Sequence, residues 1–230
     1  MRLIRINAPR PVAESTVAPT VPTARPVLLV HGLGGLTSGW FTLASALHAQ
    51  GVTVAAISYR PFGTSVEQLA ELLAGKVAEL LTETGADKVH LVGHSLGGVV
   101  IAQALAEGAL NGKVDTVVTV AAPFGGSPWA RLVPVGATVR SLREGSPLLR
   151  RLALAPAPAG VRWLAFTATL DLIVPGRRSV PAQGYVQTVA VEGVGHIGLL
   201  LNPQVVNGIV AALPAPEQAP ALPAPEQAAA

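Results

Sequence analysis

The five residues 93–97, which read Gly-His-Ser-Leu-Gly, constrain the fold of this chain more than any other stretch. Residues 88–92 before them indicate a short buried strand, and the uncharged run after them, to about Glu107, indicates an apolar helix. A serine in so tight a strand-to-helix turn takes a strained backbone conformation, and the flanking glycines remove Cβ atoms that would clash. This is the pattern of a nucleophile elbow, which exposes the hydroxyl above the positive end of a helix. We predict that Ser95 is a nucleophile; the alternative is an ordinary glycine-rich turn.

Short apolar strands alternate with amphipathic helices along the rest of the chain. We expect strands at residues 27–30, 52–59, 88–92, 114–121, 163–169 and 185–191, and further helices at 40–50, 65–82 and 203–213. Residues 2–6 fit a short edge strand. This alternation predicts an α/β fold with a mostly parallel central sheet of about six strands and helices on both faces.

A chain of 230 residues is long enough for one domain with a sizeable core. We expect this domain at residues 26–213, between an extended Pro-rich N-terminal arm (1–25) and a low-complexity Pro/Ala tail (214–230). Within the domain, residues 123–162 carry six arginines against a single glutamate. This segment is either a surface excursion with solvated arginines or a small cap (lid) whose apolar face lines an acyl pocket.

The composition excludes several classes of protein. The net charge of +3 arises from 16 basic and 13 acidic residues, and basic residues interleaved with aromatics are missing, so nucleic acid is not an expected partner. The absence of cysteine excludes disulfides and thiolate catalysis. The arginine-rich start has no apolar stretch after it, so we expect no signal peptide and a cytoplasmic location. Glycine and polar residues interrupt both long uncharged stretches (89–106 and 193–216), which predicts no transmembrane segment.

A serine nucleophile needs a base, and among the five histidines His196 is the best candidate. It lies in a glycine-flexed loop just past the last predicted strand, at the sheet edge where sites form in parallel α/β proteins. The alternative for His196 is a capping or structural role. The other four are expected elsewhere: His90 in a strand of the core, His48 on a surface helix, His94 packed beside the site, and His31 fixing its own loop by hydrogen bonds.

The base in turn needs an acid to orient it, and Asp171 follows the strand predicted at 163–169. Asp87 and Asp115 begin strands and therefore belong to the opposite edge of the sheet. Glu192, four residues before His196, is the alternative acid, although its position fits a solvent-facing charge at a strand end.

The oxyanion of a tetrahedral intermediate needs two preorganised donors, each worth about 3 kcal/mol of transition-state stabilisation. One is the backbone N–H of Leu96, directly after the serine. We predict that the other is the N–H of Leu33, with Gly34 as the alternative, in the glycine-rich loop after the first core strand. That loop lacks the patterns of dinucleotide-binding and phosphate-binding loops, and the alternative interpretation is a plain tight turn.

Four segments carry a resemblance to a known family: Val-His-Gly-Leu-Gly-Gly at 30–35, Gly-His-Ser-Leu-Gly-Gly at 93–98, Asp-Leu-Ile-Val-Pro at 171–175, and Gly-Val-Gly-His-Ile-Gly-Leu-Leu at 193–200. They resemble the small bacterial α/β-hydrolase lipases and the related hydrolases of the inositol-deacylase type, over about residues 27–213. The resemblance implies the α/β-hydrolase fold and hydrolysis of carboxylic esters without metal or organic cofactor. It also implies a triad of Ser95, Asp171 and His196, in the chain order of that superfamily.

The chain departs from the family at one motif, where a common Pro-His-x-Gly-Ser segment here reads Pro-Phe-Gly-Gly-Ser at 123–127. The expected function is that of a serine esterase or lipase, which takes a small-molecule ester or lipid and forms an acyl-enzyme. An acyltransferase or thioesterase with the same triad is one alternative. A binding protein with the hydrolase fold and no turnover is another.

Overall fold

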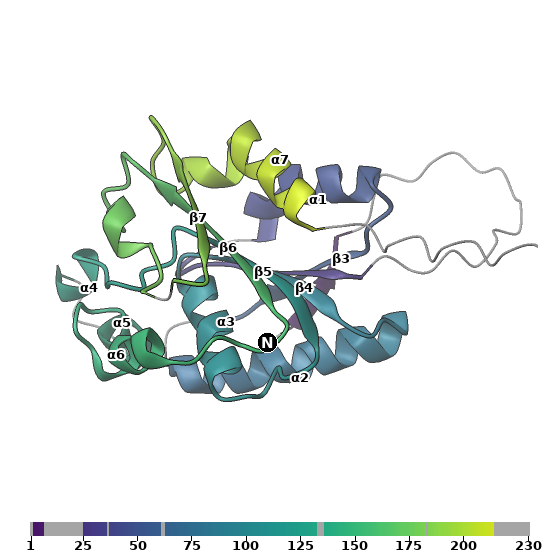
Figure 1. Cartoon of the computed structure of the whole chain (residues 1–230), viewed down its shortest axis with the longest axis horizontal. Helices are drawn as coiled ribbons and strands as arrows, with labels where there is room; N and C mark the ends of the chain where they lie inside the picture. The colour runs from purple at the N-terminus through teal and green to yellow at the C-terminus, as the bar shows by residue number, and fades with distance from the viewer. Residues whose placement is uncertain are drawn as a thin grey trace, which may run out of the picture.

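The computed structural model describes residues 2–6, 25–35, 37–60, 63–132, 136–182 and 184–213. Its centre is a seven-stranded sheet in the order β1-β3-β2-β4-β5-β6-β7 (Figure 1). All neighbouring strands are parallel except β1, which pairs antiparallel with β3. The strands are β1 (Arg2–Arg5), β2 (Val27–Val30), β3 (Val54–Ser58), β4 (Val89–His94), β5 (Val114–Val120), β6 (Arg162–Ala168) and β7 (Gln187–Val191).

Helices cover both faces of this sheet (Figure 1). On one face lie α2 (Val66–Thr84) and α3 (Leu96–Ala106), and on the other lie α1 (Phe41–Ala49) and α7 (Pro203–Ala212). Three short helices follow β5: α4 (Trp129–Leu132), α5 (Ala137–Ser141) and α6 (Pro147–Leu154). Single turns of 3-10 helix, η1 (Thr37–Trp40), η2 (Gly176–Arg178) and η3 (Gly198–Leu201), lie in the connections.

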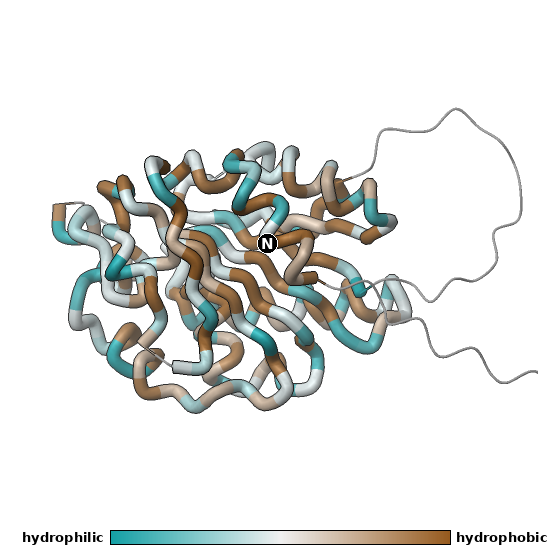
Figure 2. The backbone as a smooth tube through the Cα atoms, turned by 45° about the horizontal axis from the view of Figure 1, so that its top comes forward, coloured by the Kyte–Doolittle hydropathy of each residue, from teal (hydrophilic) through white to brown (hydrophobic). Residues whose placement is uncertain are grey.

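The continuous apolar runs of the strands follow from this double cover. In β2, Leu28 and Val30 belong to the core under α2 and α3, whereas Val27 and Leu29 belong to the core under α1 and α7. All four are fully buried, because a strand between two helical layers has no solvent face. Figure 2 shows these strands as brown, apolar traces through the middle of the molecule.

Local signals set the ends of the helices. The hydroxyl of Ser65 accepts from the backbone N–H of Gln68, whose side chain bonds back to Ser65, which forms a capping box at the start of α2. Gly85 ends the same helix in the left-handed conformation, with φ of +69°. Asn202 caps α7 by accepting from the first backbone N–H groups of that helix.

The predicted α/β fold is confirmed, and the edge strand expected at residues 2–6 joins the six core strands to make a sheet of seven. The seventh is β1, which adds the first residues of the predicted N-terminal arm (1–25) to the edge of the sheet. The rest of that arm, residues 7–24, and the predicted tail (214–230) lie outside the described residues. No helix among the described residues is long and apolar enough to cross a membrane.

Candidate active site

The elbow has the strained geometry that its sequence predicts. Ser95 joins β4 to α3 with φ of +53° and ψ of −122°, a conformation that L-residues rarely adopt. A Cβ on Gly97 would lie 2.1 Å from the Val30 carbonyl oxygen, and one on Gly93 would lie 2.7 Å from the Gly98 nitrogen. The glycines are therefore required by close backbone packing around Ser95.

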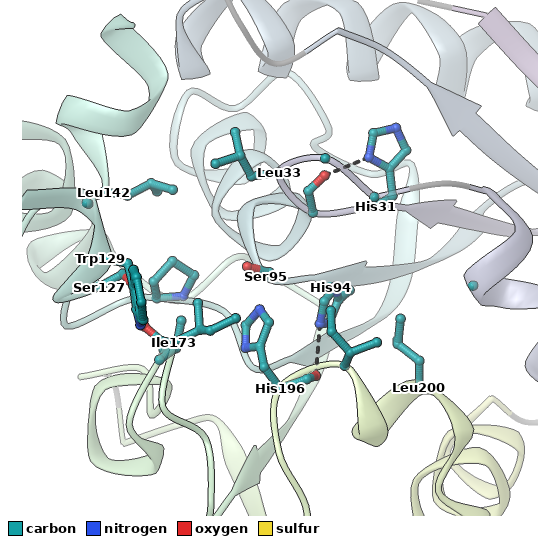
Figure 3. Close-up of a pocket in the computed structure, with 18 of the residues that line it drawn as sticks. His31, Leu33, His94, Ser95, Ser127, Trp129, Leu142, Ile173, His196 and Leu200 are labelled. Carbon is teal, nitrogen blue, oxygen red and sulfur yellow. Dashed lines mark hydrogen bonds between the residues drawn. The ribbon is translucent and has the colours of Figure 1, made fainter. Parts of the chain in front are cut away.

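Parallel pairing brings the three predicted catalytic side chains to one edge of the sheet. Ser95 directly follows β4, Asp171 lies just past β6, and His196 lies just past β7. The Asp171 Oδ2 atom lies 2.7 Å from His196 Nδ1, and the side chain of Asp171 is completely buried. Figure 3 shows the His196 ring beside Ser95. The geometry thus places an acid, an imidazole and a hydroxyl together.

The hydrogen bonds of Asp171 select one tautomer of His196. Asp171 Oδ1 accepts from the backbone N–H groups of Ile173 (2.8 Å) and Val174 (2.7 Å), which leaves Oδ2 for the imidazole. Because a carboxylate accepts hydrogen bonds, the proton of a neutral His196 sits on Nδ1. Nε2 then has a free lone pair, which is the state that can accept a proton from Ser95.

The sequence places His94 beside the site, and the structure shows that it contacts His196 directly. His94 Nε2 lies 3.2 Å from the carbonyl oxygen of His196, and the two rings lie 4.7 Å apart, centre to centre (Figure 3). Burial, with a smaller contribution from the charge of His196, lowers the pKa of His94 to about 3. His94 is therefore a neutral donor that holds the backbone of the base loop.

His31 fixes the glycine-rich loop by hydrogen bonds, as predicted. Its Nδ1 donates to the Gly32 carbonyl at 2.8 Å, and its ring stacks on Tyr59 at 4.1 Å. Burial lowers the pKa of His31, which favours the neutral form of the ring. Leu33 of this loop lines the pocket, and Leu96 begins α3 directly after Ser95. The oxyanion role of their N–H groups stays a prediction.

Ser95 and His196 open into a largely apolar pocket of about 610 Å³. Leu33 and Leu200 line one part of it (Figure 3), together with Ile197. The opposite wall comes from the segment 123–162, which contributes Pro123, Ser127, Trp129, Ala130, Val139 and Leu142. The part of this segment from Pro123 to Leu142 thus lines the site.

The alternative acids lie away from the base. Asp87 and Asp115 sit at the opposite edge of the sheet, where both accept hydrogen bonds from Arg25. Glu192 is exposed to solvent. Within the described ranges, no group of three or more His, Cys, Asp or Glu side chains is arranged to hold a metal ion.

Comparison with known proteins indicates the same α/β fold that the structure shows. Residues 25–137 match the protein family described as alpha/beta hydrolase fold. A lipase from Bacillus licheniformis, in its mature form, superposes with a TM-score of 0.72 at 20% identity, over 85% of this chain and 96% of that chain. The family match includes the elbow but ends before Asp171, so the assignment of the acid and the base depends on the geometry described above.

Two relatives are similar over about half of this chain. A triacylglycerol lipase of Burkholderia plantarii is 34% identical over 134 residues, which are 55% of this chain and 36% of that protein. The dihydrolipoyllysine-residue acetyltransferase component of the acetoin cleaving system of Cupriavidus necator is 33% identical over 133 residues, 56% of this chain and 35% of that protein. The match thus spans little more than a third of the length of each relative.

Proposed function

We propose that this chain, which belongs to the α/β-hydrolase superfamily, hydrolyses carboxylic esters through an acyl-enzyme formed on Ser95. The observation that carries the proposal is the buried pair of Asp171 and His196, 2.7 Å apart, beside a serine held at positive φ. A scaffold without turnover would gain nothing from a strained serine and a buried carboxylate aimed at a histidine.

In the acylation step, Ser95 Oγ attacks the ester carbonyl carbon while His196 Nε2 takes the hydroxyl proton. Asp171 stabilises the imidazolium that forms, and the N–H groups of Leu33 and Leu96 are the proposed donors to the oxyanion. The carbon–oxygen bond to the leaving group then breaks, and His196 returns the proton to the departing alcohol. Water repeats the sequence on the acyl-enzyme and releases the acid.

The pocket supports an apolar ester as the substrate. Its walls include leucine, isoleucine, valine and tryptophan side chains, and its polar lining is limited to a few serine and histidine side chains, Ser95 and His196 among them. A binding site of this kind gains affinity by removing hydrocarbon from water and orients the ligand through a few polar atoms. The relative from Burkholderia plantarii is a triacylglycerol lipase, which agrees with a substrate that carries an acyl chain.

The test is hydrolysis of nitrophenyl butyrate and octanoate by the purified chain, together with labelling by a fluorophosphonate. We expect turnover of both esters and a single label on Ser95, and we expect Ser95→Ala to lose both. Ser141→Ala is the matched control: it removes a hydroxyl that bonds within α5, and we expect it to keep both hydrolysis and labelling. Added alcohols that divert most of the acyl group from water would instead indicate a transferase. A wild-type chain that neither hydrolyses nor labels would refute the proposal.

A further inference from the structure

The loop after β6 that carries Asp171 (residues 171–175, called the acid loop below) is held from outside by two side chains of the segment after β5. The hydroxyl of Ser127 donates to the carbonyl of Ile173 at 2.6 Å, and the indole N–H of Trp129 donates to the carbonyl of Leu172 at 2.9 Å. Both donors also line the catalytic pocket, where Figure 3 shows them together beside Ile173. Neither residue type, at its position in the sequence, indicates a role in the site.

The two accepting carbonyls belong to the peptide groups that bind the catalytic carboxylate. The carbonyl of Leu172 shares a peptide group with the N–H of Ile173, and the carbonyl of Ile173 shares one with the N–H of Val174. Both of these N–H groups donate to Asp171 Oδ1, at 2.8 and 2.7 Å. Two hydrogen-bonded chains therefore run from the pocket wall through a peptide group to the same carboxylate oxygen. Hydrogen bonds in series polarise and strengthen one another.

The acid loop has little other packing to keep it in place. Leu172 is 82% exposed and Ile173 is 39% exposed, so their side chains contribute little burial. Among residues 172–174, Val174 alone is fully buried. The positions of the two peptide groups, and with them the direction of Asp171 Oδ2 toward His196, depend on bonds to the backbone.

We propose that Ser127 and Trp129 are positioning residues for Asp171, each acting through the peptide group that its side chain bonds. The inference rests on the proposed function, because positioning matters only if Asp171 serves a catalytic base. Ser127 fixes the peptide group before Val174, and Trp129 fixes the one before Ile173. The pocket wall thereby holds the acid of the triad as well as contacting the substrate.

The variants Ser127→Ala and Trp129→Phe remove one donor each and keep most of the side-chain volume. We expect each to lower kcat about tenfold, since a displacement of well under 1 Å in a catalytic group has effects of this order. For Ser127→Ala we expect KM to stay unchanged. Ser127→Thr restores the hydroxyl and should restore kcat. Ser141→Ala removes a hydroxyl from the same segment without touching the acid loop, and should leave kcat unchanged.

Two further measurements separate positioning from a general loss of structure. We expect the low-pH limb of the kcat/KM profile to shift to lower pH in Ser127→Ala, because a less firmly held Asp171 stabilises the protonated His196 less. We also expect the low-field proton NMR signal of the His196 Nδ1–H, assigned by its loss in Asp171→Ala, to broaden or move upfield. This signal does not depend on turnover.

The outcomes distinguish the inference from the proposed function. If the wild-type chain is inactive, the proposed function fails, and the NMR signal still reports whether the two donors hold Asp171. If the wild-type chain is active and both single variants match it in kcat, pH profile and NMR signal, the inference is wrong. Should Ser127→Ala fail to fold, Trp129→Phe is the deciding variant, because Trp129 is half exposed and the substitution keeps an aromatic ring at this position.

Discussion

His90 is a buried histidine whose two ring nitrogens have no hydrogen-bond partner, and it should make the protein sensitive to acid. It lies in the middle of the sheet on β4, between Val27 of β2 and Thr116 of β5, and is 2% exposed. The nearest carboxylate oxygen, on Asp115, lies 3.5 Å from Nδ1 without forming a hydrogen bond.

Burial lowers the pKa of His90 to about 4, and the charge of Asp115 opposes this shift without overcoming it. Arg25 and Arg162, which also face Asp115, lower the pKa of His90 further. In the unfolded chain the same ring titrates near 6.5. Between these values the unfolded state binds a proton that the folded state does not, so stability is complete above pH 6.5 and falls as the pH drops toward 4. The loss attributable to this ring is about 3 kcal/mol at pH 4.

His90→Leu tests this reasoning, because leucine has a similar volume and no ionisable group. At pH 7 the variant should be more stable by about 1–2 kcal/mol, since an unsatisfied buried polar ring is replaced by hydrocarbon. At pH 4 the advantage should grow by about 3 kcal/mol more. Urea unfolding of both proteins at pH 7, 6, 5 and 4 gives the free energy of unfolding of each as a function of pH. The contribution of the acidic groups that both proteins share cancels when one curve is subtracted from the other. Parallel curves would refute the argument.

Three further predictions concern the elbow and the acid. Ser95→Gly should abolish turnover and raise the stability by about 1 kcal/mol in thermal unfolding, because glycine adopts positive φ without strain. Gly97→Ala should lower the free energy of unfolding by about 3 kcal/mol or more, because the new Cβ would lie 2.1 Å from the Val30 carbonyl oxygen. The control is Gly75→Ala in the middle of α2, where the new Cβ meets no atom within 4 Å; this variant should raise the free energy of unfolding by about 1 kcal/mol. Asp171→Asn should lower kcat about 10⁴-fold in ester hydrolysis while KM changes little, because an amide favours the wrong imidazole tautomer.

The fold and the meeting of the three catalytic candidates could be predicted because topology makes distant residues converge. Strand-to-helix alternation implies a parallel sheet, and a parallel sheet brings the ends of its strands to one edge. Asp171 and His196 stand just past such ends, so their proximity follows without any knowledge of side-chain contacts. The edge strand at residues 2–6 is also expected from the sequence, but its partner is not, because the pairing of this four-residue strand of mixed polarity with β3 is decided by tertiary contact.

The supporting residues could not be predicted for a different reason. His94, Ser127 and Trp129 all act on backbone carbonyls of loops far away in the sequence. A carbonyl is present at every residue, so no residue type or spacing marks the one that accepts the bond. In addition, His94 occupies the variable position of the elbow pattern, where sequence reasoning expects no specific role.

The bonds of Ser127 and Trp129 also bear on whether the predicted cap (123–162) can open as a lid. Moving α4 away from the pocket would break the bond from Trp129 to the acid loop, and the Ser127 N–H is itself tied to the Leu142 carbonyl at 2.9 Å. An opening of this wall would therefore release Asp171 at the moment when substrate enters. A lid that activates a lipase when it opens requires the opposite, namely that the catalytic residues stay in place in the open state.

We accordingly expect ester hydrolysis without a jump in rate when the substrate passes its solubility limit. The measurement is a rate profile over nitrophenyl esters of increasing chain length, each taken below and above that limit. A flat or falling response would agree with a wall that stays in place while the pocket is filled. A sharp rise above the limit would show that the wall moves while the enzyme is active. The contacts of Ser127 and Trp129 would then belong to the resting state alone, and their role in positioning Asp171 would be refuted with them.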